Sequence, residues 1–238
     1  MTKIEYVLKK QVAVISLNSG DNRFNPDFIK GLLDVLDDIE HRTSATVVVA
    51  HSTHENIFSN GIDLEWLSPI LQNGGIETAK DFFRLLNRLF VRMLSFPAIT
   101  IGAINGHAFA GGAIFSCAFD FRFMQTGRGF FCLPEIDINI PFLPGMNAIL
   151  GKAIPRYQLD LMELTGVRLT AEECEAHHII LKACPPETVV DEAMQFAEAL
   201  DKNRETIAEM KRRLNRKIIQ TIETEDEPFI ASGIFHIG

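Results

Sequence analysis

The residues best suited to chemistry are a stretch rich in glycine and alanine and one glutamate that follows it. Residues 103–120 read AINGHAFAGGAIFSCAFD and carry no charged residue before Asp120. An apolar strand before the stretch and a short apolar helix opening at Ala110-Gly111-Gly112 leave free backbone N–H groups at the turn. Because glycine has no side chain, an anionic or carbonyl oxygen can come within hydrogen-bonding range of these groups. The spacing fits neither a dinucleotide-binding nor a P-loop pattern.

Glu135 is the candidate base. It lies in a largely apolar stretch that contains Phe130, Phe131, Leu133 and Ile136. A carboxylate with few polar neighbours has a raised pKa, which brings it closer to the range useful for taking and returning protons. A loop or helix-end glutamate with no catalytic role is the alternative.

Three segments together resemble one family. FSNGIDL at 58–64, the stretch at 103–120 and PEIDINIPFLPG at 134–145 come in the order and spacing of the crotonase (enoyl-CoA hydratase/isomerase) superfamily. The resemblance covers residues 1 to about 185. It implies an α/β fold, a crotonase-type spiral of ββα units, with a C-terminal helical region that assembles trimers or dimers of trimers. We therefore expect an acyl-CoA-binding core at 1–185 and a helical region at 186–238.

The resemblance also implies which residues act. The backbone N–H groups of Ile62 and Gly111 would form an oxyanion hole for the thioester oxygen of an acyl-CoA, and Glu135 would be a catalytic glutamate. Such preorganised donors stabilise an enolate oxygen, and losing one costs about a hundredfold or more in rate. By motif position, the substrate contacts are Asn22, Arg23, Phe24, Ser59, Asn60, Gly61, Asp63, Leu64, Phe109, Gly112, Ile114 and Pro134.

Some of these assignments have alternatives. Arg23 is the preferred candidate for a CoA phosphate, whereas the basic residues at 211–217 are better explained as a solvated helix face. Asp63 is equally well explained as a residue of a helix's first turn. His107 is more readily a core or hydrogen-bonded histidine than a residue facing the pocket.

One departure from the family pattern points to a particular reaction. Hydratases of the family carry a second glutamate three residues after the oxyanion-hole glycine, and here Ile114 stands at that position. Adding water needs two acids to hold and activate the water, whereas moving a double bond needs one carboxylate that reaches two carbons in turn. The sequence therefore resembles the isomerases that convert 3-enoyl-CoA to 2-enoyl-CoA, including plant members. A hydratase, a thioester hydrolase and a non-catalytic acyl-CoA-binding protein are the alternatives.

The elements that must position these residues follow from periodicity and capping. A hairpin is expected at 3–8 and 11–17, a helix from Asn25-Pro26-Asp27, strands at 46–51, 98–104, 120–125 and 130–133, and a helix at 78–94. Further along, a capping box begins at Thr170, a short strand spans 179–184, and two helices span about 187–201 and 204–222. These last helices are amphipathic beyond what one core requires, which predicts a homotrimer or hexamer.

Composition limits the class of protein. The chain has 238 residues and a net charge of -8, which argues against nucleic-acid and anionic-membrane partners. No apolar run approaches the ~20 residues of a membrane span, and the N-terminus lacks a signal-peptide core, so we expect a cytoplasmic protein. The four cysteines show no CxxC spacing and are expected to be reduced. We expect no metal and no cofactor other than the CoA of the substrate.

Overall fold

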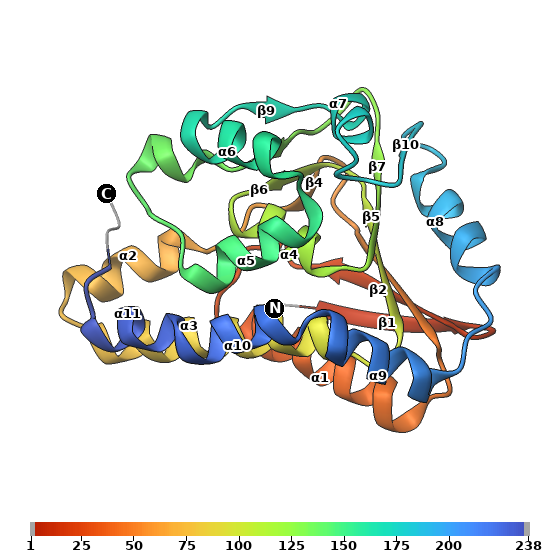
Figure 1. The fold of residues 1–238 in the computed structure, drawn as a ribbon, viewed down its shortest axis with the longest axis horizontal. Coiled ribbons are helices and arrows are strands. Elements are labelled where there is room, and N and C mark those ends of the chain that lie inside the picture. The colour runs from red at the N-terminus through yellow and green to blue at the C-terminus, as the bar shows by residue number, and fades with distance from the viewer. Residues whose placement is uncertain (1–2, 236–238) are drawn as a thin grey trace.

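The computed structural model describes residues 3–235 as a mixed α/β fold with two sheets (Figure 1). The larger sheet has the strand order β1-β2-β3-β5-β7-β10, spanning Lys3–Lys9, Val12–Asn18, Val47–Ser52, Ile99–Ile104, Phe121–Gln125 and Lys182–Cys184. The smaller sheet has the order β4-β6-β8-β9, spanning Ile57–Ser59, His107–Phe109, Phe131–Cys132 and Arg168–Leu169. The helices are α1 Pro26–Arg42, α2 Leu64–Gln72, α3 Ile76–Ser95, α4 Gly111–Ala118, the 3₁₀ helix η1 Pro134–Ile138, α5 Pro144–Ala153, α6 Arg156–Thr165, α7 Ala171–Ala176, α8 Val189–Glu198, α9 Arg204–Leu214, α10 Arg216–Thr224 and α11 Asp226–Ser232.

The chain repeats one path three times. A strand of the larger sheet is followed by a strand of the smaller sheet and then by a helix: β3-β4-α2, β5-β6-α4 and β7-β8-η1. The strands of successive turns pair in parallel in both sheets. This is the predicted spiral of ββα units, and it is confirmed. Because parallel strands end at one edge, the spiral brings the segments after β4, β6 and β8 together.

Two apolar layers hold the spiral. The main core lies between the larger sheet and helices α1 and α3, where Phe24, Phe28, Phe58 and Phe115 are fully or almost fully buried and their rings pack against one another. The opposite face of the sheet is covered by α8, which buries Val189, Ala193, Met194 and Ala197. The sheet is therefore covered on both faces, as its runs of β-branched residues predict.

The C-terminal helices serve this core. Helices α10 and α11 lie along α3 (Figure 1), and Ile222 and Ile230 belong to the main core. The apolar face of α8 is likewise buried against the larger sheet. The expectation that the helices at 187–222 exceed the needs of one core is therefore wrong for α8 and α10. On α9, Met210 and Leu214 do remain exposed.

Most expected elements are present, with several differences. Asn25 caps α1 by accepting from the Phe28 N–H, and Thr170 forms the predicted capping box. The helix expected at 204–222 is broken at Asn215, whose buried amide donates to the Leu94 carbonyl. Helices α2 and α11 were not expected. Their signals are a capping Asp63 for α2 and the acidic pair Asp226-Glu227 in the first turn of α11.

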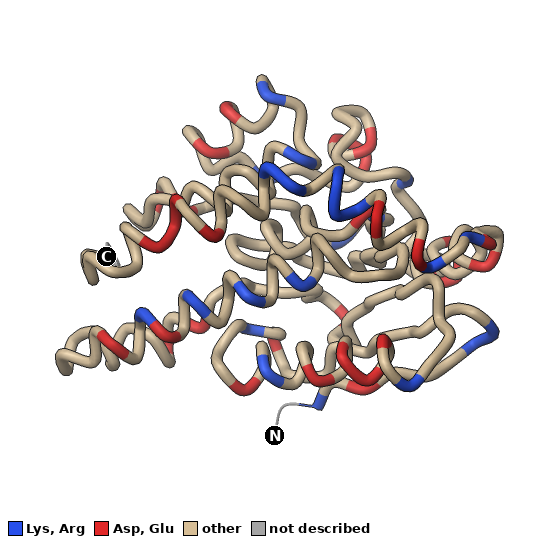
Figure 2. The backbone as a smooth tube through the Cα atoms, turned by 60° about the horizontal axis from the view of Figure 1, so that its bottom comes forward, with Lys and Arg blue, Asp and Glu red and all other residues tan. Residues whose placement is uncertain are grey.

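The surface mixes both signs of charge. Figure 2 shows basic and acidic residues interspersed along several helices. No helix in the described part of the chain is long and apolar enough to cross a membrane. The four cysteines are buried and form no disulfide, as expected. Within residues 3–235, no group of three or more His, Cys, Asp or Glu side chains could hold a metal ion.

Candidate active site

The segment after β4 presents the Ile62 N–H. Phe24 clamps this segment on both sides of Ile62, because its N–H donates to the Gly61 carbonyl (2.7 Å) and its carbonyl accepts from the Asp63 N–H (3.0 Å). In a parallel bridge of this kind, the backbone N–H and carbonyl of the residue between the two bonded neighbours, here Ile62, point away from Phe24. Among the described residues, the Ile62 N–H donates to no acceptor.

The start of α4 presents a second free N–H. Gly111 is the first residue of the helix, so its N–H has no acceptor within the helix, and none among the other described residues. The preceding Ala110 has φ 52° and ψ -127°, a conformation that strongly favours glycine and costs roughly 1–3 kcal/mol in other residues. This sharp turn aims the first N–H groups of α4 out of the sheet edge, where the helix dipole adds positive potential.

Glycines let these two segments touch. Gly61 has φ +74°, and a Cβ there would lie 2.4 Å from the Gly111 nitrogen. A Cβ on Gly111 would lie 3.3 Å from the Ile62 nitrogen, so the two donors are neighbours. A Cβ on Gly112 would lie 2.2 Å from the Ser59 carbonyl oxygen. The backbones can approach this closely only because side chains are absent at Gly61 and Gly112.

Glu135 lies on η1, the corner after β8. The side chain is 6% exposed, and its Oε2 atom has no hydrogen-bond partner among the described residues. The pKa of the carboxyl is raised to about 8, chiefly by burial; a hydrogen bond from Glu135's own backbone opposes the rise, and the negative charge of Glu163 makes a smaller contribution to it. A pKa near neutrality suits a group that takes a proton and then returns it.

Glu163 is a neighbour that sequence reasoning missed. It lies on α6, which packs against η1, and its Oε1 atom is buried without a partner among the described residues. Burial also raises the pKa of this carboxyl. Glu163 lines neither of the two cavities described below, so it acts on Glu135 and not on a bound molecule. No pattern in the sequence links residues 28 positions apart on two different elements.

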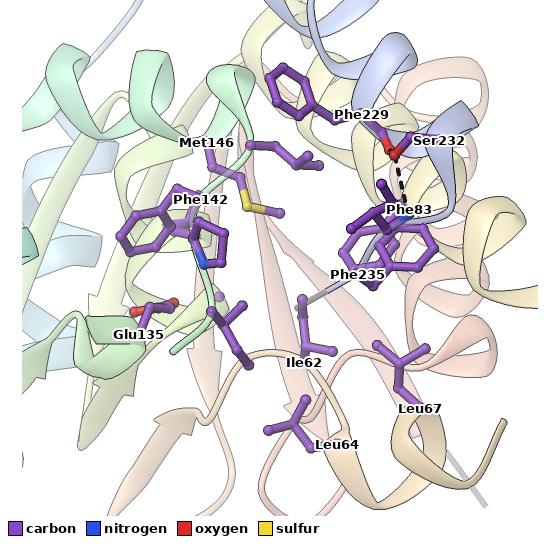
Figure 3. A pocket seen from close by; sticks show the side chains of 16 residues that line it. Ile62, Leu64, Leu67, Phe83, Glu135, Phe142, Met146, Phe229, Ser232 and Phe235 are labelled. Carbon is purple, nitrogen blue, oxygen red and sulfur yellow. Dashed lines mark hydrogen bonds between the residues drawn. The ribbon is translucent and has the colours of Figure 1, made fainter. Parts of the chain in front are cut away.

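Two adjoining cavities meet at these groups, and both are lined by Ile62, Gly111 and Glu135. The larger has an empty volume of about 1170 Å³ and the smaller one of about 880 Å³, and in each the centre of a water-sized sphere can reach about 350 Å³. The larger cavity is otherwise almost entirely apolar, and Figure 3 shows its walls, with Glu135 on one side. The smaller cavity also contains Asn60, His107 and Phe109. Among the described residues that line either cavity, Glu135 is the sole carboxylate. An oxygen held by the two N–H groups would thus place neighbouring carbons of a bound chain near one base.

Five of the predicted contacts line these cavities: Asn60, Leu64, Phe109, Ile114 and Pro134. Others do not. Asn22, Phe24 and Ser59 are fully buried away from the cavities, and the Asn22 amide donates to Ser52 and Phe58 while Ser59 donates to the Asn22 carbonyl. These residues support the Gly61 segment. Asp63 is the N-cap of α2, one position before the first turn in which its alternative explanation put it.

One basic residue, Lys211, is placed differently from expectation. Arg23 is bound by Asp21 (2.9 Å) and Glu65 (2.7 Å), and it lines neither cavity. Lys211 is buried against Asp120 (2.7 Å), so it is not part of a solvated face, whereas Arg212 and Arg213 are exposed and pair with Glu209. His107 accepts from the Phe130 N–H through Nδ1, which is the hydrogen-bonded alternative, although its ring also borders the smaller cavity.

Two backbone donors beside one carboxylate, at the corners of a ββα spiral, have the chemistry to hold an oxyanion next to a group that accepts and returns a proton. Residues 8–227 match the family described as enoyl-CoA hydratase/isomerase, and the chain belongs to that family. It is 31% identical over 186 residues to enoyl-CoA delta isomerase 3 of Arabidopsis thaliana, covering 76% of each chain. It is 32% identical over 203 residues to a putative enoyl-CoA hydratase of Thermus thermophilus, covering 84% of this chain and 78% of that one.

Solved structures match the fold over nearly the full length. A probable enoyl-CoA hydratase from Mycobacterium tuberculosis superposes with a TM-score of 0.87 at 24% identity, covering 96% of this chain and 95% of that chain. A structure from the same organism named an enoyl-CoA isomerase gives the same TM-score and identity, covering 97% and 98%. The crotonase-type fold expected from the three motifs is therefore confirmed, while the relatives carry both names.

Proposed function

We propose that this enzyme moves the double bond of a 3-enoyl-CoA to the 2-position. The thioester oxygen is held by the N–H groups of Ile62 and Gly111, which stabilise the negative charge that develops when an alpha proton leaves. Glu135 takes that proton, holds it as a neutral acid, and returns it at the gamma carbon of the dienolate. The protons and charge balance, and no water or cofactor is consumed.

One observation supports this proposal most directly: Glu135 is the sole carboxylate among the described residues that line the two cavities. The position that holds the second acid in hydratases is Ile114, which is 1% exposed and lines the larger cavity. An apolar side chain there cannot hold a water molecule against the double bond, because a buried water needs two or more polar partners. The similarity to a plant delta isomerase is consistent with the same reaction.

The direct assay uses trans-3-hexenoyl-CoA and follows the absorbance of the conjugated 2-enoyl thioester. Wild type is expected to form this product, and Glu135→Gln is expected to lose at least about a hundredfold in rate while still binding acyl-CoA, because an amide of the same shape cannot accept the proton. Turnover by the glutamine variant within a few fold of wild type would contradict the role of Glu135.

The remaining parts of the proposal concern contacts with CoA, cofactors, cellular location and oligomeric state. Arg23 and the other expected contacts with CoA, the absence of a metal or further cofactor, and a cytoplasmic location stay predictions.

We also propose a homotrimer or hexamer. Support comes from exposed apolar side chains on two packed elements, Ile136 and Ile138 on η1 and Tyr157, Leu161 and Leu164 on α6, because a monomer seldom leaves so many apolar groups in water on adjacent elements.

A further inference from the structure

The C-terminal segment forms one wall of the larger cavity. Phe235 stacks on Phe83 of α3, with ring centroids 4.8 Å apart and an angle of 17° between the planes. Figure 3 shows this pair across the cavity from Glu135 and Phe142. An acyl chain whose thioester lies at Ile62 and whose alpha carbon faces Glu135 would extend through this cavity toward the stacked rings.

A buried carboxylate fixes this wall in place. Asp226, at the start of α11, is fully buried, and it accepts from the Gly145 N–H of α5 (2.7 Å) and from the Asn87 amide of α3 (2.9 Å). Next to it, Glu227 pairs with Arg84 of α3 (2.7 Å). Three helices are thereby held together around the apolar cavity, so α11 is a fixed part of its lining.

The chain then turns back into the cavity. Helix α11 ends at Gly233, which has φ +67° and lies so close to α3 that a Cβ there would be 2.8 Å from the Ile76 side chain. A left-handed glycine after the last helical residue is a common helix ending. The turn places Phe235 against Phe83, where its partly buried ring lines the cavity.

We propose that Phe235, stacked on Phe83, sets the upper limit of acyl-chain length, so that the substrates are medium-chain acyl thioesters of up to about ten carbons. The inference rests on the proposed function, because it assigns this cavity to the acyl chain. The estimate of length comes from volume: a cavity of about 350 Å³ holds on the order of ten groups the size of a water molecule or methylene, at ~30 Å³ each.

Binding measurements test whether Phe235 limits chain length without relying on turnover. Saturated acyl-CoA thioesters of increasing length are titrated against wild type, Phe235→Ala and Phe235→Trp by calorimetry. Each methylene that enters the cavity should lower the dissociation constant roughly fourfold. We expect this gain to stop near ten carbons in wild type, to continue to longer chains in Phe235→Ala, and to stop earlier in Phe235→Trp. The same breakpoint in all three proteins would overturn the proposal.

A matched control and a second readout complete the test. Phe196→Ala removes a ring that packs on Phe121 and Phe123 beneath α8, away from the cavity, and should leave the breakpoint unchanged. The ratio of kcat/KM for fourteen-carbon and six-carbon 3-enoyl-CoA cancels any loss of folded enzyme, and it should rise about tenfold or more in Phe235→Ala. If wild type shows the breakpoint but no isomerisation, the role of Phe235 in limiting chain length is supported and the proposed reaction is contradicted. If isomerisation occurs but neither the breakpoint nor the kcat/KM ratio changes in Phe235→Ala, the proposed role of Phe235 is wrong.

Discussion

At the scale of single residues, the site depends on keeping one carboxylate out of water. Glu135 has a pKa raised to about 8 because burial favours its neutral form. The base must be ionised to take the alpha proton, so kcat/KM should rise with pH through this pKa. A carboxylate with an ordinary pKa would be ionised at neutral pH but would hold the abstracted proton too weakly between the two transfer steps.

Glu163 offers a way to adjust this value. Replacing it by glutamine removes the negative charge that raises the pKa of Glu135, so the acid limb of the pH profile should move to lower pH. Other groups nearby that titrate or carry charge include Cys132 on β8, whose own pKa is raised by burial, Arg168 on β9 and Asp137 on η1. Asp137→Asn is the matched control, because Asp137 is exposed and does not contribute to the raised pKa of Glu135. An acid limb that stays in place in Glu163→Gln would show that Glu163 does not contribute to the raised pKa.

At the scale of elements, the corners after β4 and β6 must touch to bring the two donors together. Gly61→Ala adds a Cβ that would lie 2.4 Å from the Gly111 nitrogen. The segments must then separate, and we expect at least about a hundredfold loss of kcat, which is the typical cost of losing one oxyanion donor. Gly74→Ala is a close control, since its φ of +77° imposes similar strain with open space around the added atom. Gly74→Ala should lose stability but keep its activity, and equal losses of kcat in both variants would contradict this account of Gly61.

The same corners explain what could be predicted from sequence. The placement of Gly111 at the start of a helix and the burial of Glu135 could be predicted from local patterns, a glycine turn before an apolar segment and a carboxylate among apolar residues. Asn22 and Ser59 were taken for substrate contacts because the motif places them near the site, but their polar groups hydrogen-bond within the protein and hold the backbone of the Gly61 segment. Glu163 and Phe235 could not be predicted, since each meets its partner only through tertiary packing of distant elements.

At the scale of the whole molecule, the exposed apolar residues of α6 and η1 predict a subunit contact close to Glu135. Leu164→Lys, at a side chain that is 71% exposed, should lower the mass measured by light scattering at micromolar concentration, because it places a charge in an apolar contact. Leu214→Lys on α9, 75% exposed, is the matched control and should keep the wild-type mass. A smaller mass for Leu214→Lys alone would assign assembly to the C-terminal helices, and a monomeric wild type would contradict assembly altogether.

The central claim is that one carboxylate moves a proton within a bound acyl chain and that the site cannot add water. The most direct test compares two rates of the wild-type enzyme, isomerisation of trans-3-hexenoyl-CoA and hydration of crotonyl-CoA. Because Ile114 replaces the second acid, isomerisation should exceed hydration by at least about a hundredfold, the lower end of what one positioned acid or base contributes. Hydration at a rate comparable to isomerisation would contradict the claim and identify the enzyme as a hydratase.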